Sequence, residues 1–333
     1  MAAYTTIDDP SAYFKVQLYT GTGSSNAQTF ADTDTDMQPD MVWIKSRSDA
    51  FNHMLYDSVR GVQKHLKPDG TNAEATDVNA LTAFGSDGFT VGSNSDLNNS
   101  SDTYVAWCWK ESATAGFDIV LYTGNGTDDT DISHSLSAVP HFMMIKKRSA
   151  TGNWEVYHHK VSSDPETDYL NLDLTAAVGD SAGYWSDEAP TSSVFTLGNG
   201  ATNTDSQTFV TYLWRSVQGY SKFGSYTGNG NADGVFVYTG FRPAFLMVKR
   251  TGGVGPYIVF DNKRAGYNVS NYMLFAERTS AEDAGSTERV DLLSNGFKML
   301  NSDVDHNGAE SYVYMAFAEA PFVNSKGVPC NAR

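Results

Sequence analysis

The stretch FKVQLYTGTGS, at Phe14 to Ser24, returns twice more along the chain. It reads FDIVLYTGNGT at Phe117 to Thr127 and SKFGSYTGNGN at Ser221 to Asn231. The tyrosines of these stretches lie 103 residues apart (19 to 122) and 104 residues apart (122 to 226). A near-constant period of this length indicates that one structural unit occurs three times in the chain.

Each copy carries four further landmarks in the same order. A proline opens an apolar run that ends in basic residues, as PDMVWIKSR from Pro39, PHFMMIKKR from Pro140 and PAFLMVKR from Pro243. A second strand-like segment and a short segment around a phenylalanine follow. An aromatic segment then closes each copy, as YVAWCWK from Tyr104, FVTYLWR from Phe209 and YVYMAFAE from Tyr312. Five marks in one order make coincidence a poor explanation.

These landmarks read as strands and turns. Asn125-Gly126 and Asn229-Gly230 are dipeptides typical of a tight hairpin turn with positive φ. The apolar run Met41 to Ile44 predicts a strand that is buried on both faces or lies in the interior of a sandwich. The closing segment has bulky residues on both faces, so we expect it in the middle of its sheet. Each copy thus holds about six or seven short strands, which predicts a β-sandwich or a related barrel.

The sequence therefore predicts an all-β protein made of three tandem β-sandwich repeats. Their expected bounds are residues 1–112, 113–218 and 219–333, the last including a C-terminal tail. The linkers are short, such as Glu111 to Gly116, so we expect the copies to pack against one another. Three units are fewer than the roughly four blades that a propeller needs to close. One larger sandwich interlaced from all three copies is the competing architecture.

Composition narrows the function classes. The chain has 39 acidic and 23 basic residues among 333, a formal net charge of −16, which disfavours binding to a nucleic-acid backbone. Two cysteines, Cys108 and Cys330, do not make a disulfide framework. Met1 to Phe14 lacks the features of a secretory signal, and no segment approaches ~18 consecutive apolar residues. We therefore expect neither secretion nor a membrane span.

Two acidic runs resemble the start of a calcium-binding loop, in which alternating oxygen ligands precede a glycine. In the first run Met37 stands where the loop needs glycine, and in the second Tyr314 stands where it needs a bidentate glutamate. We expect both runs in polar hairpin loops and predict no metal site. The runs are Asp32, Asp34, Asp36 and Asp303, Asp305, Asn307, Gly308.

The basic residues that follow each apolar run are Lys45 and Arg47, then Lys146, Lys147 and Arg148, then Lys249 and Arg250. We interpret them as structural, with Asp57 or Asp261 on the next strand as cross-strand partners, rather than as a site for an anion. His158 takes the place of these aspartates in the middle copy, which favours a surface-facing strand position.

No segment matches a nucleotide-binding glycine loop, a His-Glu-x-x-His zinc helix or a Gly-x-Ser-x-Gly nucleophile elbow. The seven histidines do not recur at equivalent places in the three copies. The sequence therefore predicts no catalytic residue, no cofactor and no enzymatic activity. Paired carboxylates for glycoside cleavage stay open, because their separation depends on the tertiary structure.

Three aromatic residues of the middle copy are candidate ligand contacts: Trp154, Tyr184 and Trp185. Trp185 lies in the loop-like stretch DSAGYWSDEAP, where a stacking platform for a sugar is plausible. A packing role is the favoured alternative for all three, because aromatic side chains dominate buried cores.

Several long phrases carry a family resemblance: AYTTIDDPSAYF from Ala3, GFRPAFLMVKR from Gly240, LLSNGFK from Leu292 and the ending GVPCNAR. With the repeated YTGNG, they resemble a domain of uncharacterised function found in marine tailed phages, including those of cyanobacteria. The resemblance spans essentially the whole chain. It implies a virion-associated structural protein with a lectin-like or jelly-roll-like sandwich fold, and it supplies no catalytic residues.

We expect a tail fibre or tail-surface component that contributes to host attachment, located in the virion and assembled in the host cytoplasm. Its expected partners are other virion proteins, a host cell-surface glycan and copies of itself in a homotrimer, with no nucleic acid and no membrane. The alternative is a capsid decoration protein, of the cement or head-fibre kind. A polysaccharide-degrading enzyme ranks last, because similarity of fold does not transmit function.

Overall fold

The computed structural model describes residues 3–30, 35–285 and 289–330. Strands account for 42% of the structure and helices for 3%, and every strand pairing is antiparallel, so the predicted all-β class is confirmed. The helical segments are single turns: η1 (Pro10–Ala12), α1 (Ser95–Asn98) and α2 (Ala182–Trp185). None of the helices in the described ranges is long and apolar enough to cross a membrane.

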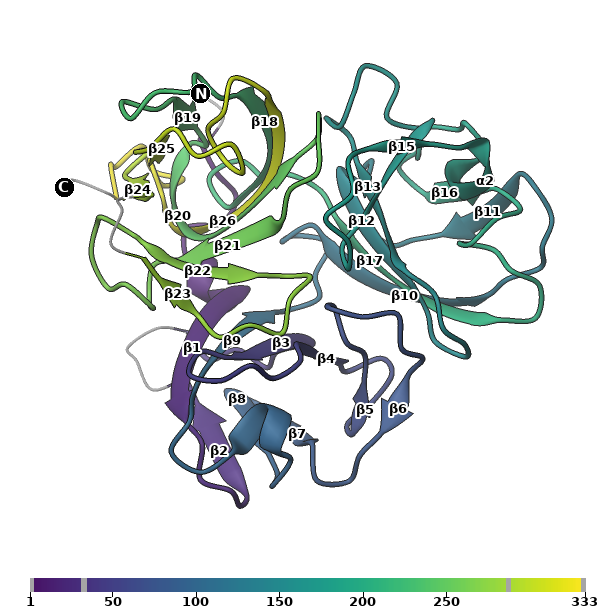
Figure 1. Cartoon of the computed structure of the whole chain (residues 1–333), viewed down its shortest axis with the longest axis horizontal. Coiled ribbons are helices and arrows are strands. Elements are labelled where there is room, and N and C mark those ends of the chain that lie inside the picture. The colour runs from purple at the N-terminus through teal and green to yellow at the C-terminus, as the bar shows by residue number, and fades with distance from the viewer. Residues whose placement is uncertain (1–2, 31–34, 286–288, 331–333) are drawn as a thin grey trace.

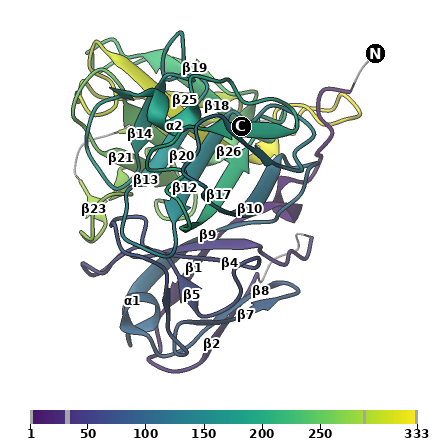
Figure 2. The same cartoon turned by 90° about the vertical axis from the view of Figure 1, so that its right-hand side faces the viewer.

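The strands fall into three groups along the chain, seen as three lobes in Figure 1. Group 1 runs from β1 (Phe14–Thr20) to β9 (Thr103–Trp109), group 2 from β10 (Phe117–Thr123) to β17 (Thr208–Trp214), and group 3 from β18 (Ser221–Thr227) to β26 (Ser311–Pro321). Figure 2 shows group 1 lying below the other two. No sheet among the described residues pairs strands of different groups, which argues against an interlaced sandwich.

Each group has one main sheet with the same strand order. In group 1 the order is β1-β9-β3-β4, where β3 is Met41–Ser46 and β4 is Met54–Asp57. Groups 2 and 3 repeat it and add two strands at one edge. The closing strand lies between two neighbours in all three sheets, as predicted. The orders are β10-β17-β12 (Phe142–Lys147)-β13 (Trp154–His158)-β14 (Asp168–Asn171)-β15 (Gly179–Asp180) and β18-β26-β20 (Phe241–Arg250)-β21 (Tyr257–Asp261)-β22 (Tyr272–Phe275)-β23 (Asp283–Ala284).

A smaller sheet accompanies each main sheet, and the two share a local apolar cluster. Group 1 also contains a two-stranded ribbon of β5 (Lys64–His65) and β6 (Ala75–Thr76). Among the described residues the three groups hold nine, eight and nine strands, more than the six or seven expected. The smaller sheets are β2 (Asn26–Thr29)-β8 (Gly88–Val91)-β7 (Leu81–Gly85), β11 (Thr130–Ser133)-β16 (Val194–Leu197) and β19 (Phe236–Tyr238)-β25 (Gly296–Met299)-β24 (Val290–Leu293).

The main sheets bury both faces, because their opposite sides contact different cores. In β3, Met41 and Trp43 belong to a central cluster, whereas Val42 and Ile44 belong to the local cluster of group 1. This alternation follows from the two-residue period of a strand. It explains why the run reads as continuously apolar and confirms the predicted burial of both faces.

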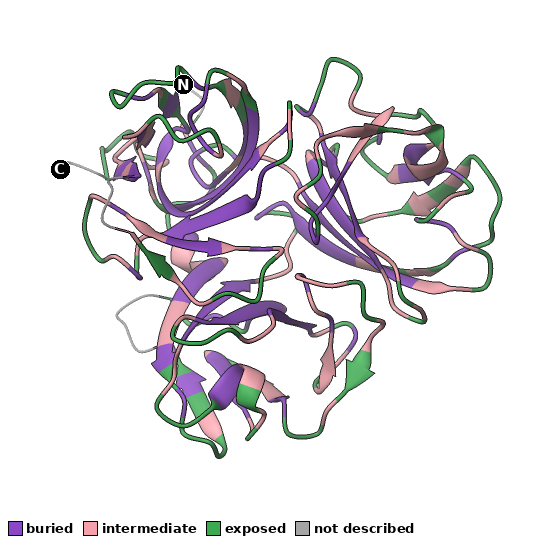
Figure 3. Cartoon of the chain, in the orientation of Figure 1, coloured by how far each residue is buried: buried purple, intermediate pink, exposed green. Residues whose placement is uncertain are grey.

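The central cluster draws residues from all three groups, so the groups pack against one another, as expected from the short linkers. Trp109, Trp214 and Phe317 occupy equivalent places in the three closing strands, opposite Phe14, Phe117 and Ser221. The rings of Trp109 and Trp214 lie 6.3 Å apart, and those of Trp109 and Phe317 lie 5.6 Å apart, centroid to centroid. Figure 3 shows the buried strands converging on this centre.

The YTGNG stretches are not hairpin turns, which corrects the prediction. β10 pairs with β17 and β11 pairs with β16, so the turn connects a main sheet to a smaller sheet. Gly126 has a φ of 67°, the conformation that favours glycine, whereas Asn125 uses its side-chain oxygen to accept a hydrogen bond from the Thr127 amide at 2.8 Å. The equivalent glycines, Gly23 and Gly230, have φ values of 70° and 64°.

Candidate functional site

The aromatic residues predicted as candidate ligand contacts are placed in packing positions. Trp154 and Trp185 are buried, and their indole N–H groups donate to the carbonyls of Lys67 and Asp168, each at 2.8 Å. Tyr184 stacks on Tyr169 with ring centroids 3.9 Å apart. Neither tryptophan presents a ring face to solvent, so a sugar platform on these residues is not supported.

The acidic runs do not form a metal centre in the described part of the chain, where no group of three or more histidine, cysteine or acidic side chains is arranged to hold a metal ion. Asp32 and Asp34 lie outside the described residues. The loop after Asp303 is closed by hydrogen bonds instead. The carbonyl of Asp303 accepts from the Asn307 amide at 2.7 Å, and the side chain of Asn307 donates to the carbonyls of Asn231 and Asn301.

The repeated lysines are buried and bonded to backbone carbonyls. The Nζ atoms of Lys45, Lys146 and Lys249 donate to the carbonyls of Ser46, Thr71 and Gly255 at 2.8, 3.0 and 2.6 Å. Burial lowers the pKa of each lysine to about 8. The predicted cross-strand partners were wrong, because the aspartates lie opposite Met41 and Phe245, four residues before Lys45 and Lys249.

Asp57 instead belongs to an ion cluster between groups 1 and 2. It pairs with Arg60, whose Nη1 also lies 3.1 Å from Oε2 of Glu74. Glu74 bonds Arg148 of group 2 at 2.9 Å, and the hydroxyl of Tyr212 donates to Asp57 at 2.5 Å. The whole cluster joins two groups that are neighbours along the chain.

An equivalent cluster joins group 3 to group 1. Asp261 pairs with Arg264 at 2.6 Å, and Arg264 lies 3.1 Å from Glu282. Glu282 bonds Arg47 of group 1 at 2.9 Å, and the indole N–H of Trp107 donates to Asp261 at 3.1 Å. In both clusters the group that supplies the aspartate contacts the next group in the cyclic order 1, 2, 3, 1.

The contact between groups 2 and 3 has different residues at these places. His158 replaces the aspartate, Val161 the first arginine, Val178 the glutamate and Thr251 the second arginine. His158 accepts from the Lys160 amide at its Nδ1, so its Nε2 donates to the carbonyl of Tyr314 at 3.1 Å. It is only 1% exposed, so the predicted surface position of His158 was wrong. The face of the sheet that carries His158 is turned toward group 3.

A cleft of about 850 Å³ opens beside this third contact. We name it groove A. Its lining comes from the edge strand β18, from β19, from the two residues that follow β13 and from Tyr4 near the N-terminus. The lining residues are Tyr4, His159, Lys160, Ser216, Gln218, Ser221 to Tyr226, Phe236 to Gly240, and Tyr314.

Groove A has an aromatic wall. Phe236 and Tyr238 alternate with buried Val237 on β19, so both rings point to the same side, and they are 47% and 48% exposed. The hydroxyl of Tyr4 lies 3.1 Å from that of Tyr238 and donates to the carbonyl of Gly240 at 2.9 Å. These rings are open to solvent, in contrast to Trp154 and Trp185.

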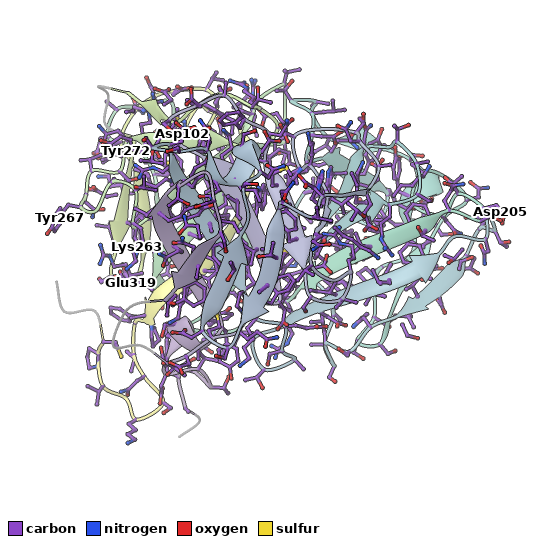
Figure 4. All side chains as sticks on the ribbon, turned by 90° about the horizontal axis from the view of Figure 1, so that it is seen from below. Asp102, Asp205, Lys263, Tyr267, Tyr272 and Glu319 are labelled. Atoms are coloured by element: carbon purple, nitrogen blue, oxygen red, sulfur yellow. The ribbon has the colours of Figure 1, made fainter. Side chains whose placement is uncertain are left out.

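A second cleft of about 500 Å³, groove B, lies in the equivalent position between groups 3 and 1. It follows β1 where groove A follows β18, and Asn262 and Lys263 stand where His159 and Lys160 stand in groove A. Lys263 and Glu319 lie close together at its rim in Figure 4. Its two phenylalanines, Phe14 and Phe30, are both buried, so groove B lacks an exposed aromatic wall.

The residues of groove A were missed in the sequence, although a comparison of the three copies contains their signal. Val237 is equivalent to Gln28 and Ile132, because each lies opposite the phenylalanine of the next strand. Phe236 and Tyr238 therefore stand where the other copies have small or polar residues, namely Ala27, Asp131, Thr29 and Ser133.

Comparison with known proteins identifies a family. Residues 9–321 match the model of a family described as "Domain of unknown function (DUF7483)", which covers most of the chain. The chain therefore belongs to this family. No curated protein and no solved structure matches the chain.

Proposed function

We propose that this member of the DUF7483 family is a structural, non-enzymatic component of a phage particle, carried on a tail fibre or on the tail surface. We propose further that it contributes to host attachment by holding a host cell-surface glycan in groove A. The resemblance of the sequence phrases to a domain of marine tailed phages supports the virion location. The observation that carries the attachment role is the exposed aromatic wall of groove A.

We also propose that the three strand groups are three copies of one β-sandwich, with boundaries near residues 1–112, 113–218 and 219–333. The common order of the main sheets and the matching registers of their closing strands support this. The cyclic order of the contacts between groups supports a closed ring. A rigid ring suits attachment, because loops on a rigid scaffold can meet a ligand with little loss of conformational entropy.

Groove A supports binding rather than cleavage. Hydrolysis of a glycosidic bond commonly needs a pair of carboxyl groups that flank the scissile bond. Among the described residues that line groove A, none is an aspartate or a glutamate. In groove B, Asp9 accepts hydrogen bonds from Ser11 and Thr35, and Glu319 pairs with Arg242. These carboxylates are engaged in the structure of the protein itself.

Competition for adsorption tests the attachment role. Purified protein added to host cells before the phage should occupy the glycan and slow adsorption in proportion to its concentration. An antibody against the protein, which binds the phage particle instead of the host, should also slow adsorption. Undisturbed adsorption in both experiments would contradict the attachment role.

A capsid decoration protein is the second candidate, and the ring of three similar groups favours it, because such a ring can cover a threefold position on a symmetric shell. Copy number per particle separates the two. Hundreds of copies would place the chain on the head, and a few dozen or fewer would place it on the tail. For either location we propose a homotrimer, which light scattering of the purified protein would test.

A further inference from the structure

We propose that groove A selects an anionic saccharide, a sugar ring that carries a carboxylate or sulfate group, and that Lys222 and Lys160 supply the selectivity. This inference rests on the proposed glycan-binding role of groove A and names the class of its ligand. The sugar ring would stack on the wall formed by Phe236 and Tyr238, and its charged substituent would reach the lysines.

The charge of groove A is opposite to that of the chain as a whole. The chain has 39 acidic and 23 basic residues. The part of groove A that the structure describes is lined by two lysines and a histidine but by no acidic residue. Because an acidic surface repels anions in general, a local cationic cleft gives an anionic ligand one favoured place to bind.

Lys222 is placed to bind a charged substituent on a sugar ring that stacks on Tyr238. Its Nζ lies 5.5 Å from the centroid of the Tyr238 ring and donates to the Tyr238 carbonyl at 2.6 Å. An ammonium group has three donors, so two remain for a ligand. Burial lowers the pKa of Lys222, and a bound anion would offset this effect by favouring the charged form.

Lys160 is exposed, also lines groove A and comes from group 2. The neighbouring His159 is not available in the same way, because its Nε2 bonds the carbonyl of Phe223 at 2.9 Å and its ring stacks on His141. Burial also lowers the pKa of His159, which favours its neutral form. Within the described lining of groove A, the two lysines are therefore the cations that a ligand can reach.

The occupant is a saccharide rather than a peptide strand. A peptide would extend the main sheet by pairing with the free edge of β18. That edge is blocked at Phe223, whose amide donates to Oγ of Ser216 at 3.2 Å and whose carbonyl accepts from His159. The exposed rings of β19 offer the flat apolar surface that the face of a sugar can cover.

Matched oligosaccharide pairs test the inference by calorimetry on the full chain. One pair is oligogalacturonate and its methyl ester, which differ in the carboxylate charge. The other is a sulfated galactan oligosaccharide and its desulfated form. We expect the full chain to bind the charged member of one pair at least about tenfold tighter than the neutral member. The pair that shows the preference identifies the anionic group.

The variant Lys222→Met should lose most of that preference, a drop of about tenfold for the charged oligosaccharide, with little change for the neutral one. Lys160→Met should show a smaller drop of the same kind. Lys326→Met, an exposed lysine outside groove A, is the matched control and should bind like the wild type. Circular dichroism of each variant checks that the fold is intact.

Equal affinity for charged and neutral members would overturn the anionic selectivity but leave glycan binding in place. Binding of an acidic peptide, such as oligoglutamate, with the affinity of the charged sugar would overturn the choice of a saccharide. Failure to bind any of these sugars would also overturn this inference. The proposed attachment role would then be judged separately, by the adsorption experiment.

Discussion

Single buried asparagines hold the turns that identify the repeat. Asn98, Asn203 and Asn307 are buried, and each accepts a hydrogen bond from the backbone of a YTG-containing turn. The residue before each asparagine also accepts a hydrogen bond from the tyrosine of the same stretch, at 2.7, 2.6 and 2.6 Å. The repeated letters YTG are therefore explained by a turn contact that forms three times.

Removing one of these asparagines should destabilise the protein. The side chain of Asn203 accepts from the Asn125 amide and donates to Asn125 Oδ1 and the Thr127 carbonyl. Asn203→Ala leaves these buried groups unpaired, so we expect a loss of about 2–3 kcal/mol in the free energy of unfolding by urea. The control Asn72→Ala, at an exposed position, should change it by less than about 0.5 kcal/mol.

The buried ion cluster gives a second prediction at this scale. Arg60→Val removes the partner of buried Asp57, and a buried charge left unpaired costs about 3–5 kcal/mol. The double change Asp57→His with Arg60→Val installs the pair found in group 2 and should lose clearly less than Arg60→Val alone. Urea unfolding of the wild type, of Arg60→Val and of the double variant measures this, and a loss in the double variant as large as that in Arg60→Val would contradict the interpretation.

Single residues show which structural features the sequence could predict and which it could not. The run Met41 to Ile44 predicted burial on both faces, because one strand between two cores must be apolar throughout. The same reasoning failed for His158, because a polar side chain on a strand reads as surface-facing unless the neighbouring group is known. Phe236 and Tyr238 were also missed, because only the tertiary structure shows that their edge strand borders a cleft.

At the scale of elements, the three contacts between groups are built from matched partners. In two of the contacts the neighbouring group offers a side-chain donor, Tyr212 or Trp107. The facing strand of the other group then ends in an aspartate that accepts this hydrogen bond. Where that neighbour is Met315, which has no such donor, His158 donates to a backbone carbonyl instead. The third contact therefore relies on histidines, and groove A opens beside it.

This contact should be sensitive to acid. Burial lowers the pKa of His158 from 6.5 to about 3 and that of His141 to about 4. Because these pKa values lie below those of the unfolded chain, the unfolded state binds more protons, and stability falls as the pH drops below about 6.5. Protonation at Nδ1 of His158 would also remove the acceptor of the Lys160 amide.

The variant His158→Asn keeps an acceptor for that amide but does not titrate. Between pH 7 and pH 5 it should lose about 1–2 kcal/mol less stability than the wild type, because other titrating groups are common to both proteins. Urea unfolding at both pH values gives the difference. Equal acid sensitivity of the two proteins would show that His158 does not contribute.

At the scale of the whole molecule, the shared central cluster makes the three groups depend on one another. Group 2 alone, residues 113–218, would expose Phe142, Trp154 and Trp214 to solvent. Burial of such side chains is worth roughly 1.5–3 kcal/mol each, so we expect the fragment to lack a cooperative unfolding transition. The full chain should unfold in one transition. A fragment that folds independently would indicate sandwiches joined without a common core.

Groove A depends on this arrangement, because its walls come from groups 2 and 3 and from the N-terminal segment.

Attachment through groove A is the central claim, and competition for adsorption with groove variants tests it most directly. Wild-type protein should slow adsorption of the phage to its host, and the double variant Phe236→Ala with Tyr238→Ala should not. The control Tyr267→Ala removes an aromatic ring that is 82% exposed outside groove A and projects from the edge of the molecule in Figure 4. This control should slow adsorption as the wild type does. Equal inhibition by the double variant and the wild type would contradict the account.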